Sequence, residues 1–201
     1  MPVRARLSLM LAATFVLAAA AAVVLFATAG DPSAGQGFQG ALRPKGIPPA
    51  DFSLRDQDGR TVRLSGFRGR PTILTFMYST CRDTCPLTAQ QIKIAMDDVG
   101  HDVPALAVSV DPANDTPLNA RRFLVRQGLT GRMRFLLGAR AQLAPIWRSY
   151  FIQPQGNGFD HSAYVLLIDA KGIQRVGWPV SQLTPEGLAH DLRLLEAHQG
   201  A

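Results

Sequence analysis

Short apolar runs that alternate with helix-like segments constrain the fold of this chain more than any other feature. Each run is nearly continuous, which is the pattern of a strand buried on both faces of a sheet. The runs lie at residues 71–78, 103–110 and 133–137. Segments with helical spacing or capping residues follow them, at 86–99, 117–127 and 141–151. The alternation predicts right-handed strand–helix–strand crossovers and a largely parallel central sheet, with antiparallel strands at the end that make the sheet mixed.

Two hairpins and a closing helix complete the expected order of elements. Asp58-Gly59 and Lys171-Gly172 are turn residues, and each separates two strand-like segments. These segments lie at 52–54 with 61–64 and at 163–169 with 173–177. Pro145 interrupts or kinks the helix at 141–151, and a final helix covers 184–198. The sequence predicts an α/β sandwich with one core, whose active groups gather beyond the carboxyl ends of the parallel strands.

The N-terminal residues have the character of a membrane-targeting segment. All but three of residues 7–29 are apolar and none is charged, and a helix of about 34 Å crosses a bilayer core of about 30 Å. Arg4 and Arg6 precede it, so residues 1–6 are expected in the cytoplasm and the remainder on the other side. A retained anchor is favoured over a signal peptide cleaved after Ala27-Thr28-Ala29, because the run exceeds the usual signal length of about 7 to 15 residues.

The segment that follows the anchor is expected to be a tether. Residues 30–50 are rich in Gly and Pro and have no periodicity, which predicts a flexible connection to a folded domain at 51–201. The apolar run begins too early to leave room for an organellar presequence. We therefore expect a single-pass protein of a bacterial inner membrane, with its C-terminal domain in the periplasm.

The positive charge of the chain does not indicate a nucleic-acid partner. The chain has 21 Lys and Arg against 15 Asp and Glu, a net charge of +6. Arg4 and Arg6 account for two of these charges and belong to the membrane segment. The other basic residues form no long run. We therefore expect no nucleic acid to bind.

The only two cysteines of the chain form one compact motif. Cys81 and Cys85 lie between the strand at 71–78 and a helix expected to begin at Pro86. Two thiols cannot build a disulfide-dense scaffold or a four-thiolate zinc site. A helix N-terminus lowers the pKa of a nearby thiol, and Arg82 adds positive charge. The spacing allows the two sulfurs to form a disulfide or to hold one metal ion, and a purely stabilising disulfide is disfavoured because its loop is very short.

One histidine is a candidate partner for the cysteines. His161 lies between a Gly-rich loop and a strand, beside Asp160, whereas His101, His190 and His198 lack metal-binding spacing. Two thiolates and an imidazole form a soft ligand set that suits copper, and zinc is less natural without a fourth ligand. Three ligands leave one side of the ion open, which suits a carrier that must release it.

Three motifs of the sequence, taken in order, form a recognisable pattern. They are FMYSTCRDTCP at residues 76–86, VSVDPANDTP at 108–117 and DHS at 160–162. In this order, and with an N-terminal anchor ahead of them, they resemble the SCO/SenC copper proteins. This family usually has Pro where this chain has Arg82, and the change frees the backbone there and adds charge.

The resemblance implies a thioredoxin-like fold and copper, as Cu(I) or Cu(II), bound by Cys81, Cys85 and His161. It also implies assembly of the binuclear CuA site of cytochrome c oxidase, with oxidase subunit II as partner. A second periplasmic copper donor or a thiol reductant would be a further partner. Asp111 and Asp115 match the family's DPxxDTP segment and are candidates for supporting the ligands.

Two functions are open for the cysteine pair. The first is a membrane-anchored copper chaperone, which presents copper from Cys81, Cys85 and His161 to the oxidase subunit and is not an enzyme. The second is a thiol-disulfide oxidoreductase, in which Cys81 and Cys85 are a redox-active pair that keeps the oxidase's copper-binding cysteines reduced. The second function does not need His161. A thiol peroxidase is disfavoured, because only Thr80-Cys81 points to a peroxide pocket.

Overall fold

The structure is a computed structural model that describes residues 37–44, 50–155 and 163–198. The predicted cytoplasmic segment 1–6 and anchor 7–29 lie outside these residues, as does most of the tether at 30–50. Across the described ranges, no helix combines the length and the apolar character needed to span a membrane. The anchor therefore stays a prediction.

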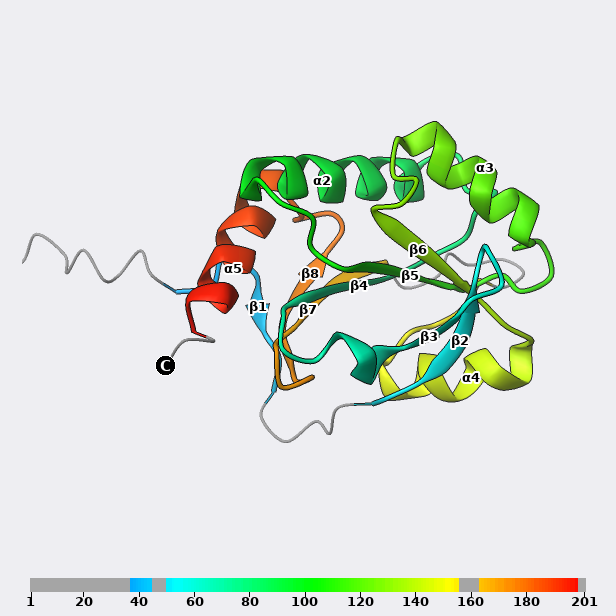
Figure 1. The fold of residues 1–201 in the computed structure, drawn as a ribbon, viewed down its shortest axis with the longest axis horizontal. Coiled ribbons are helices and arrows are strands. Elements are labelled where there is room, and N and C mark those ends of the chain that lie inside the picture. The colour runs from blue at the N-terminus through cyan, green and yellow to red at the C-terminus, as the bar shows by residue number, and fades with distance from the viewer. Residues whose placement is uncertain (1–36, 45–49, 156–162, 199–201) are drawn as a thin grey trace, which may run out of the picture. The chain divides into compact units, whose positions relative to one another are not determined.

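Within the described residues, a mixed sheet of eight strands forms the centre of the domain (Figure 1). Its spatial order is β1-β8-β7-β4-β5-β6-β2-β3. The strands are β1 (Ala41–Leu42), β2 (Ser53–Asp56), β3 (Thr61–Arg63), β4 (Thr72–Met77), β5 (Ala105–Ser109), β6 (Met133–Leu137), β7 (Tyr164–Ile168) and β8 (Gln174–Pro179). β5 pairs in parallel with β4 and β6, and the other neighbours are antiparallel. The parallel centre and both hairpins, β2–β3 and β7–β8, confirm the sequence prediction.

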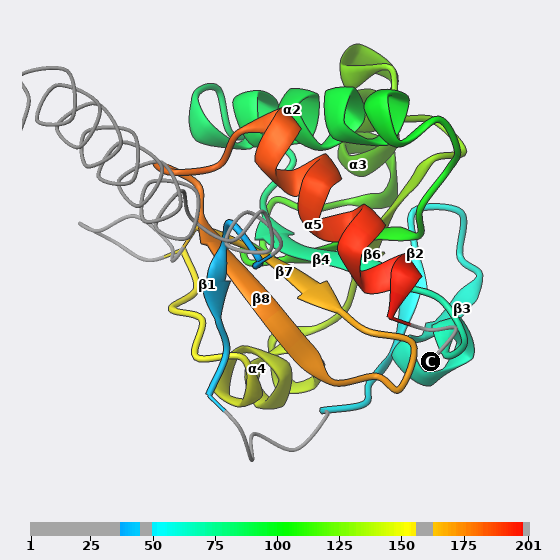
Figure 2. The same cartoon turned by 90° about the vertical axis from the view of Figure 1, so that its left-hand side faces the viewer.

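Helices cover both faces of the sheet (Figures 1 and 2). They are α2 (Thr84–Val99), α3 (Pro117–Gln127), α4 (Arg140–Ser149) and α5 (Pro185–Ala197), with a 3-10 turn, η2 (Leu64–Phe67). Apolar residues of α2, α3 and α5 share one buried cluster, and those of α4 belong to another. The prediction of one core is corrected here, because the sheet separates two apolar clusters.

Strand β4 shows why the separation arises. All six of its residues are buried. Ile73 and Met77 belong to the cluster beneath α2, whereas Leu74 and Phe76 belong to the cluster beside α4. Successive side chains of a strand point to opposite faces, so a strand covered on both faces is buried along its whole length, including Thr72 and Thr75.

The folded unit begins earlier than the predicted residue 51. It extends from Phe38, and β1 pairs with β8 along Ala41 and Leu42. The backbone N–H groups of Gln39 and Gly40 donate to the carboxylate of Asp191 on α5, at 2.7 and 2.9 Å. Figure 2 shows β1 beside β8 at the edge of the sheet. A two-residue strand has no periodicity to detect, and its partners on β8, Val176 and Gly177, lie far away along the chain.

Two helix boundaries also differ from the prediction. α2 begins at Thr84 instead of Pro86, and Gly100 ends it with a left-handed φ of 87°. Proline is tolerated in the first turn of a helix because the N–H groups there have no partner within the helix. α4 ends at Ser149 instead of residue 151. Phe151 itself has a positive φ of 57°, which takes the chain out of the helix.

Candidate functional site

The two cysteines lie where the chain leaves β4 and enters α2. The backbone N–H of Cys81 donates to the carbonyl oxygen of Tyr78 at 3.3 Å, which forms a tight turn after the strand. Cys85 is in the first turn of α2, and its backbone N–H donates to Sγ of Cys81 at 3.3 Å. First-turn N–H groups lack helical acceptors, so this one is available to the sulfur. The earlier start of α2 thus places one sulfur at the N-terminus of the helix and the other within its first turn.

Both cysteines are buried and form no disulfide, and their pKa values are shifted in opposite directions. A hydrogen bond with the Cys85 side chain lowers the pKa of Cys81 to about 5, with help from the backbone N–H groups of Cys85 and Asp83. The same bond, together with burial, raises the pKa of Cys85. At neutral pH the pair is therefore a thiolate at Cys81 and a thiol at Cys85 that donates to it.

Asp115 holds the loop that carries Cys81. Its carboxylate accepts hydrogen bonds from the backbone N–H and hydroxyl of Ser79, at 2.7 and 2.6 Å, and from the hydroxyl of Ser109 at 2.5 Å. Burial raises the pKa of Asp115 against the lowering effect of these hydrogen bonds. Ser79 is two residues before Cys81, so Asp115 connects the start of the cysteine motif to the end of β5 through Ser109.

The two aspartates of the DPxxDTP segment have different positions. Asp111 is partly exposed, and its carbonyl oxygen accepts from the N–H groups of Asn114 and Asp115. Its carboxylate accepts from the side chain of Asn114 at 2.7 Å. Thr116 caps α3 by accepting from the N–H of Asn119, whereas Asp115 turns inward to Ser79. Asp111 shapes the turn that brings Asp115 to Ser79.

His161, the predicted third ligand, lies outside the described residues. Those residues contain no group of three or more His, Cys, Asp or Glu side chains able to hold a metal ion. His101 lies 3.3 Å from Glu196, His190 lies 3.1 Å from Asp191, and His198 lies against the carbonyl oxygen of Leu194. The cysteine pair fits a soft metal ion by its donor atoms and by the thiolate at Cys81. Among the described residues, no His, Asp or Glu side chain joins the two cysteines as a third ligand.

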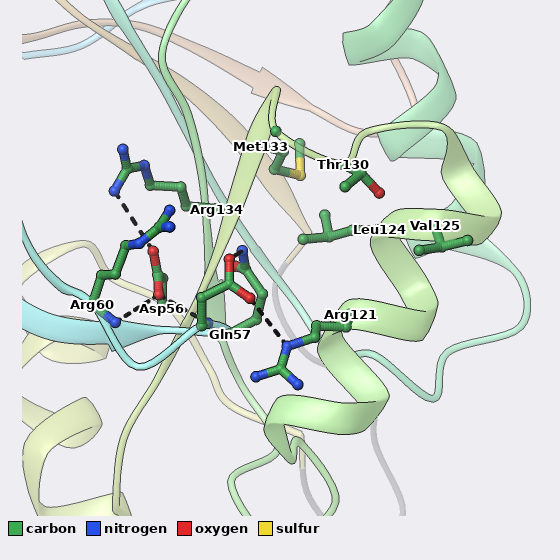
Figure 3. Close-up of a pocket in the computed structure, with 11 residues that line it drawn as sticks. Asp56, Gln57, Arg60, Arg121, Leu124, Val125, Thr130, Met133 and Arg134 are labelled. Carbon is green, nitrogen blue, oxygen red and sulfur yellow. Dashed lines mark hydrogen bonds and ion pairs between the residues drawn. The ribbon is translucent and has the colours of Figure 1, made fainter.

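A pocket of about 430 Å³ adjoins Cys81. Its walls come from the cysteine loop, from the start of α2 and from α3. A second pocket, of about 180 Å³, lies between the β2–β3 turn and α3 (Figure 3). Neither cysteine lines that pocket, and four of its charged residues form ion pairs, Arg121 with Asp58 and Arg134 with Asp56. The pocket beside Cys81 is therefore the one that can serve the thiols.

The order and geometry of these motifs match a known family. A sequence model described as SCO1/SenC matches residues 42–195. The chain belongs to the SCO1/SenC family. The matched range includes both cysteines, both aspartates of the DPxxDTP segment and His161.

Relatives of this SCO1/SenC chain include mitochondrial and bacterial proteins. A protein named "SCO2 homolog, mitochondrial" from Bos taurus is 29% identical over 146 residues, which cover 66% of this chain and 54% of that protein. Protein SenC of Rhodobacter capsulatus is 32% identical over 130 residues, which cover 60% of this chain and 58% of that protein. The chain thus spans little more than half the length of these two relatives.

Solved structures of the family share the fold. Bradyrhizobium japonicum ScoI, whose structure has copper bound, matches with a TM-score of 0.58 and 29% identity, covering 72% of this chain and 97% of that one. A SCO1/SenC family lipoprotein from Bacillus anthracis matches with a TM-score of 0.67 and 25% identity, covering 78% and 99%. The mixed sheet with flanking helices confirms the predicted thioredoxin-like α/β fold.

The sequence analysis missed the two serines of this SCO1/SenC site. Ser79 and Ser109 stand inside stretches that carry the resemblance, but they received no function. Ser109 ends β5 and is fully buried, and Ser79 follows the end of β4 and is 1% exposed. A hydroxyl at the carboxyl end of an otherwise apolar parallel strand was the available signal, because such ends gather functional groups.

Proposed function

We propose that this SCO1/SenC-family chain binds copper through Cys81, Cys85 and His161 and delivers it to the CuA site in subunit II of cytochrome c oxidase. One observation carries the proposal, which is that Cys81 and Cys85 meet at the N-terminal end of α2, where the backbone N–H of Cys85 donates to Sγ of Cys81 at 3.3 Å. Thiolates are the ligands that Cu(I) prefers, and an imidazole completes a soft three-ligand set. Copper in ScoI of Bradyrhizobium japonicum supports the choice of ion.

The chemistry of the pair suits loading and release of an ion. Cys81 is already ionised at neutral pH, so copper binding has to displace only the proton of Cys85. The pocket beside Cys81 leaves room for an incoming ligand from the acceptor protein. We place this domain in the periplasm of a bacterium, held to the inner membrane by the segment at 7–29.

Titration of the purified, reduced chain with Cu(I) and Cu(II) tests the three-ligand site. We expect one ion per chain and at least a tenfold loss of affinity in His161→Ala, because ligand loss from a metal site has a large effect. His101→Ala is the matched control, since His101 is an exposed residue beside Glu196. Unchanged copper affinity in His161→Ala would contradict the site.

A second candidate, thiol-disulfide exchange, is favoured by the same asymmetry of the two sulfurs. A thiolate at Cys81 is the attacking group that such exchange requires, and the thiol of Cys85 can then close the disulfide. This function needs both cysteines and does not need His161. The test is reduction of an oxidised acceptor peptide by the reduced chain, with His161→Ala retaining full activity. Failure of the wild-type chain to reduce the acceptor peptide would exclude thiol-disulfide exchange.

Deletion of the gene in its host separates the two functions. Oxidase activity is measured with added copper and, separately, with an added thiol reductant. Rescue by copper supports delivery of the ion. Rescue by the reductant alone supports the redox function and contradicts copper delivery as the main role.

A further inference from the structure

Three arginines line the pocket that adjoins Cys81. Arg82 comes from the cysteine loop, and Arg122 and Arg126 come from α3. All three side chains are exposed, and no acidic residue lines the pocket in the described part of the chain. The wall of the candidate copper site is therefore strongly positive.

These arginines have no carboxylate partners among the described residues. Five other arginines of the described residues do pair with a carboxylate, among them Arg132 with Asp97 and Arg193 with Asp98. Arg126 makes a hydrogen bond of 3.4 Å to the carbonyl oxygen of Ser79, which adds no negative charge. Arg122 and Arg126 are four residues apart on α3, a spacing at which like charges destabilise a helix. Such an arrangement points to an anionic group that binds from outside.

The pocket is also joined to the cysteine loop. Arg126 donates to Ser79, whose N–H and hydroxyl are held by Asp115. Cys81 is itself a lining residue although only 8% of it is exposed. A group bound by these arginines therefore lies beside Cys81.

Two exposed leucines stand next to lining residues. Leu87 follows Pro86 on α2 and is 60% exposed, and Leu118 precedes Asn119 on α3 and is 53% exposed. Exposed apolar side chains on the helices that form a polar pocket are a feature of surfaces that bind other proteins. A free small anion would make no use of them.

We propose that this pocket binds carboxylate side chains of the protein that exchanges copper with Cys81, an inference that rests on the proposed copper-transfer function. Guanidinium groups bind carboxylates through paired N–H···O contacts, so the arginines fix the orientation of an acidic segment as well as attract it. The acidic segment of the partner brings its copper ligands to the exposed side of Cys81.

The test measures binding of a short Asp- and Glu-rich peptide to the reduced, metal-free full-length chain by titration calorimetry. We expect binding that weakens as salt rises, and no binding of the matched Asn- and Gln-rich peptide. Arg122→Gln/Arg126→Gln should lower the peptide affinity about tenfold or more. Because Arg126 also holds Ser79, Arg122→Gln is measured alone, and it should lower affinity about threefold or more.

The matched control is Arg121→Gln/Arg134→Gln, which removes the same charge from the pocket in Figure 3. It should change the peptide affinity by less than about twofold. Equal losses in both double variants would overturn the proposal, because net charge alone would explain binding. Citrate that binds as tightly as the peptide would also overturn it, because the site would then take free carboxylates.

Failure of this proposal can be told apart from failure of the proposed function. The peptide experiment contains no copper, and copper binding by the wild-type chain is measured separately. A chain that binds copper but not the acidic peptide refutes the pocket alone. A chain that binds the peptide but no copper refutes the copper-transfer function, and with it the assignment of the partner.

Discussion

Two buried aspartates hold different regions of the molecule, and their partners differ in kind. Asp115 accepts from one backbone N–H and two serine hydroxyls beside the cysteines. Asp191, which is fully buried on α5, accepts from the N–H groups of Gln39 and Gly40 and from the indole N–H of Trp178 at 3.1 Å. α5 and α3, the helix that follows Asp115, lie at opposite ends of the long axis in Figure 1.

The kinds of donor around each carboxylate indicate that Asp191 is held rigidly and that Asp115 can adjust its hydrogen bonds. A hydroxyl can rotate to another acceptor, whereas a backbone N–H or an indole N–H is fixed in direction. The Asp191 region is also tight, since a Cβ on Gly40 would lie 2.5 Å from Nε1 of Trp178. We infer that Asp191 holds Gln39 and Gly40 rigidly, while Asp115 can tolerate small shifts of the loop near the thiols.

The largest effect is expected from Asp191→Ala. The substitution leaves the fixed donors of Gln39, Gly40 and Trp178 without an acceptor, which should lower the free energy of unfolding by about 4 kcal/mol. For a chain of this size the melting temperature should fall by about 10 °C. Thermal and urea unfolding provide the measurement.

Asp98→Ala is the control for Asp191→Ala. Asp98 is an exposed residue that pairs with Arg193 of α5, so its loss should change the free energy of unfolding by about 0.5 kcal/mol or less. A loss below about 1 kcal/mol in Asp191→Ala would show that the two buried aspartates are equally adjustable.

The next effect is a pH dependence confined to the thiol region. Cys81 has a folded pKa of about 5, far below the ordinary 9.0 of an unfolded cysteine. Between these values the unfolded chain binds the extra proton, so stability should rise with pH and be lost as the pH falls towards 5. Unfolding takes up at most one proton at Cys81, so stability should rise by up to about 3 kcal/mol from pH 6 to 8.

Comparison with Cys81→Ser isolates this contribution. Urea unfolding of both reduced proteins from pH 6 to 8 gives the measurement, and the wild-type chain should gain stability relative to the variant as the pH rises. Parallel pH profiles would show that Cys81 titrates alike in the folded and unfolded chains.

Asp115→Ala should have a smaller effect than either, about 2 kcal/mol. Only the N–H of Ser79 is left with a fixed direction, and removal of the carboxylate also relieves the cost of burial that raises its pKa. Unfolding in urea tests the value.

Asp115 and Asp191 share no hydrogen-bond partner, so Asp115→Ala/Asp191→Ala should show additive losses to within about 0.5 kcal/mol. If Asp115→Ala lowered the free energy of unfolding as much as Asp191→Ala, the two carboxylates would not differ in rigidity.

The two regions were not equally visible in the sequence. The cysteine pair, its position between β4 and α2, and Asp115 all belong to contiguous motifs whose chemistry and order can be read locally. Asp191 stands alone on an amphipathic helix and has partners about 150 residues away, so nothing near it predicts burial. Strands β4 and β5 were predicted because their apolar runs are long enough to show a pattern, whereas β1 is too short to show one. Periodicity needs several residues, and β1 has two.

The smallest effect is expected from Ser109→Ala, about 1 kcal/mol. The hydroxyl bond to Asp115 is lost, but the carbonyl oxygen of Ser109 still accepts from the indole N–H of Trp147 at 3.0 Å. Asp115 keeps both bonds from Ser79, so its carboxylate stays partly satisfied. In the Asp115→Ala background the cost of Ser109→Ala should disappear, because the hydroxyl then has no carboxylate to bind. A cost that persists in that double-mutant cycle would mean that Ser109 stabilises β5 by packing, and that the carboxylate of Asp115 depends on Ser79 alone.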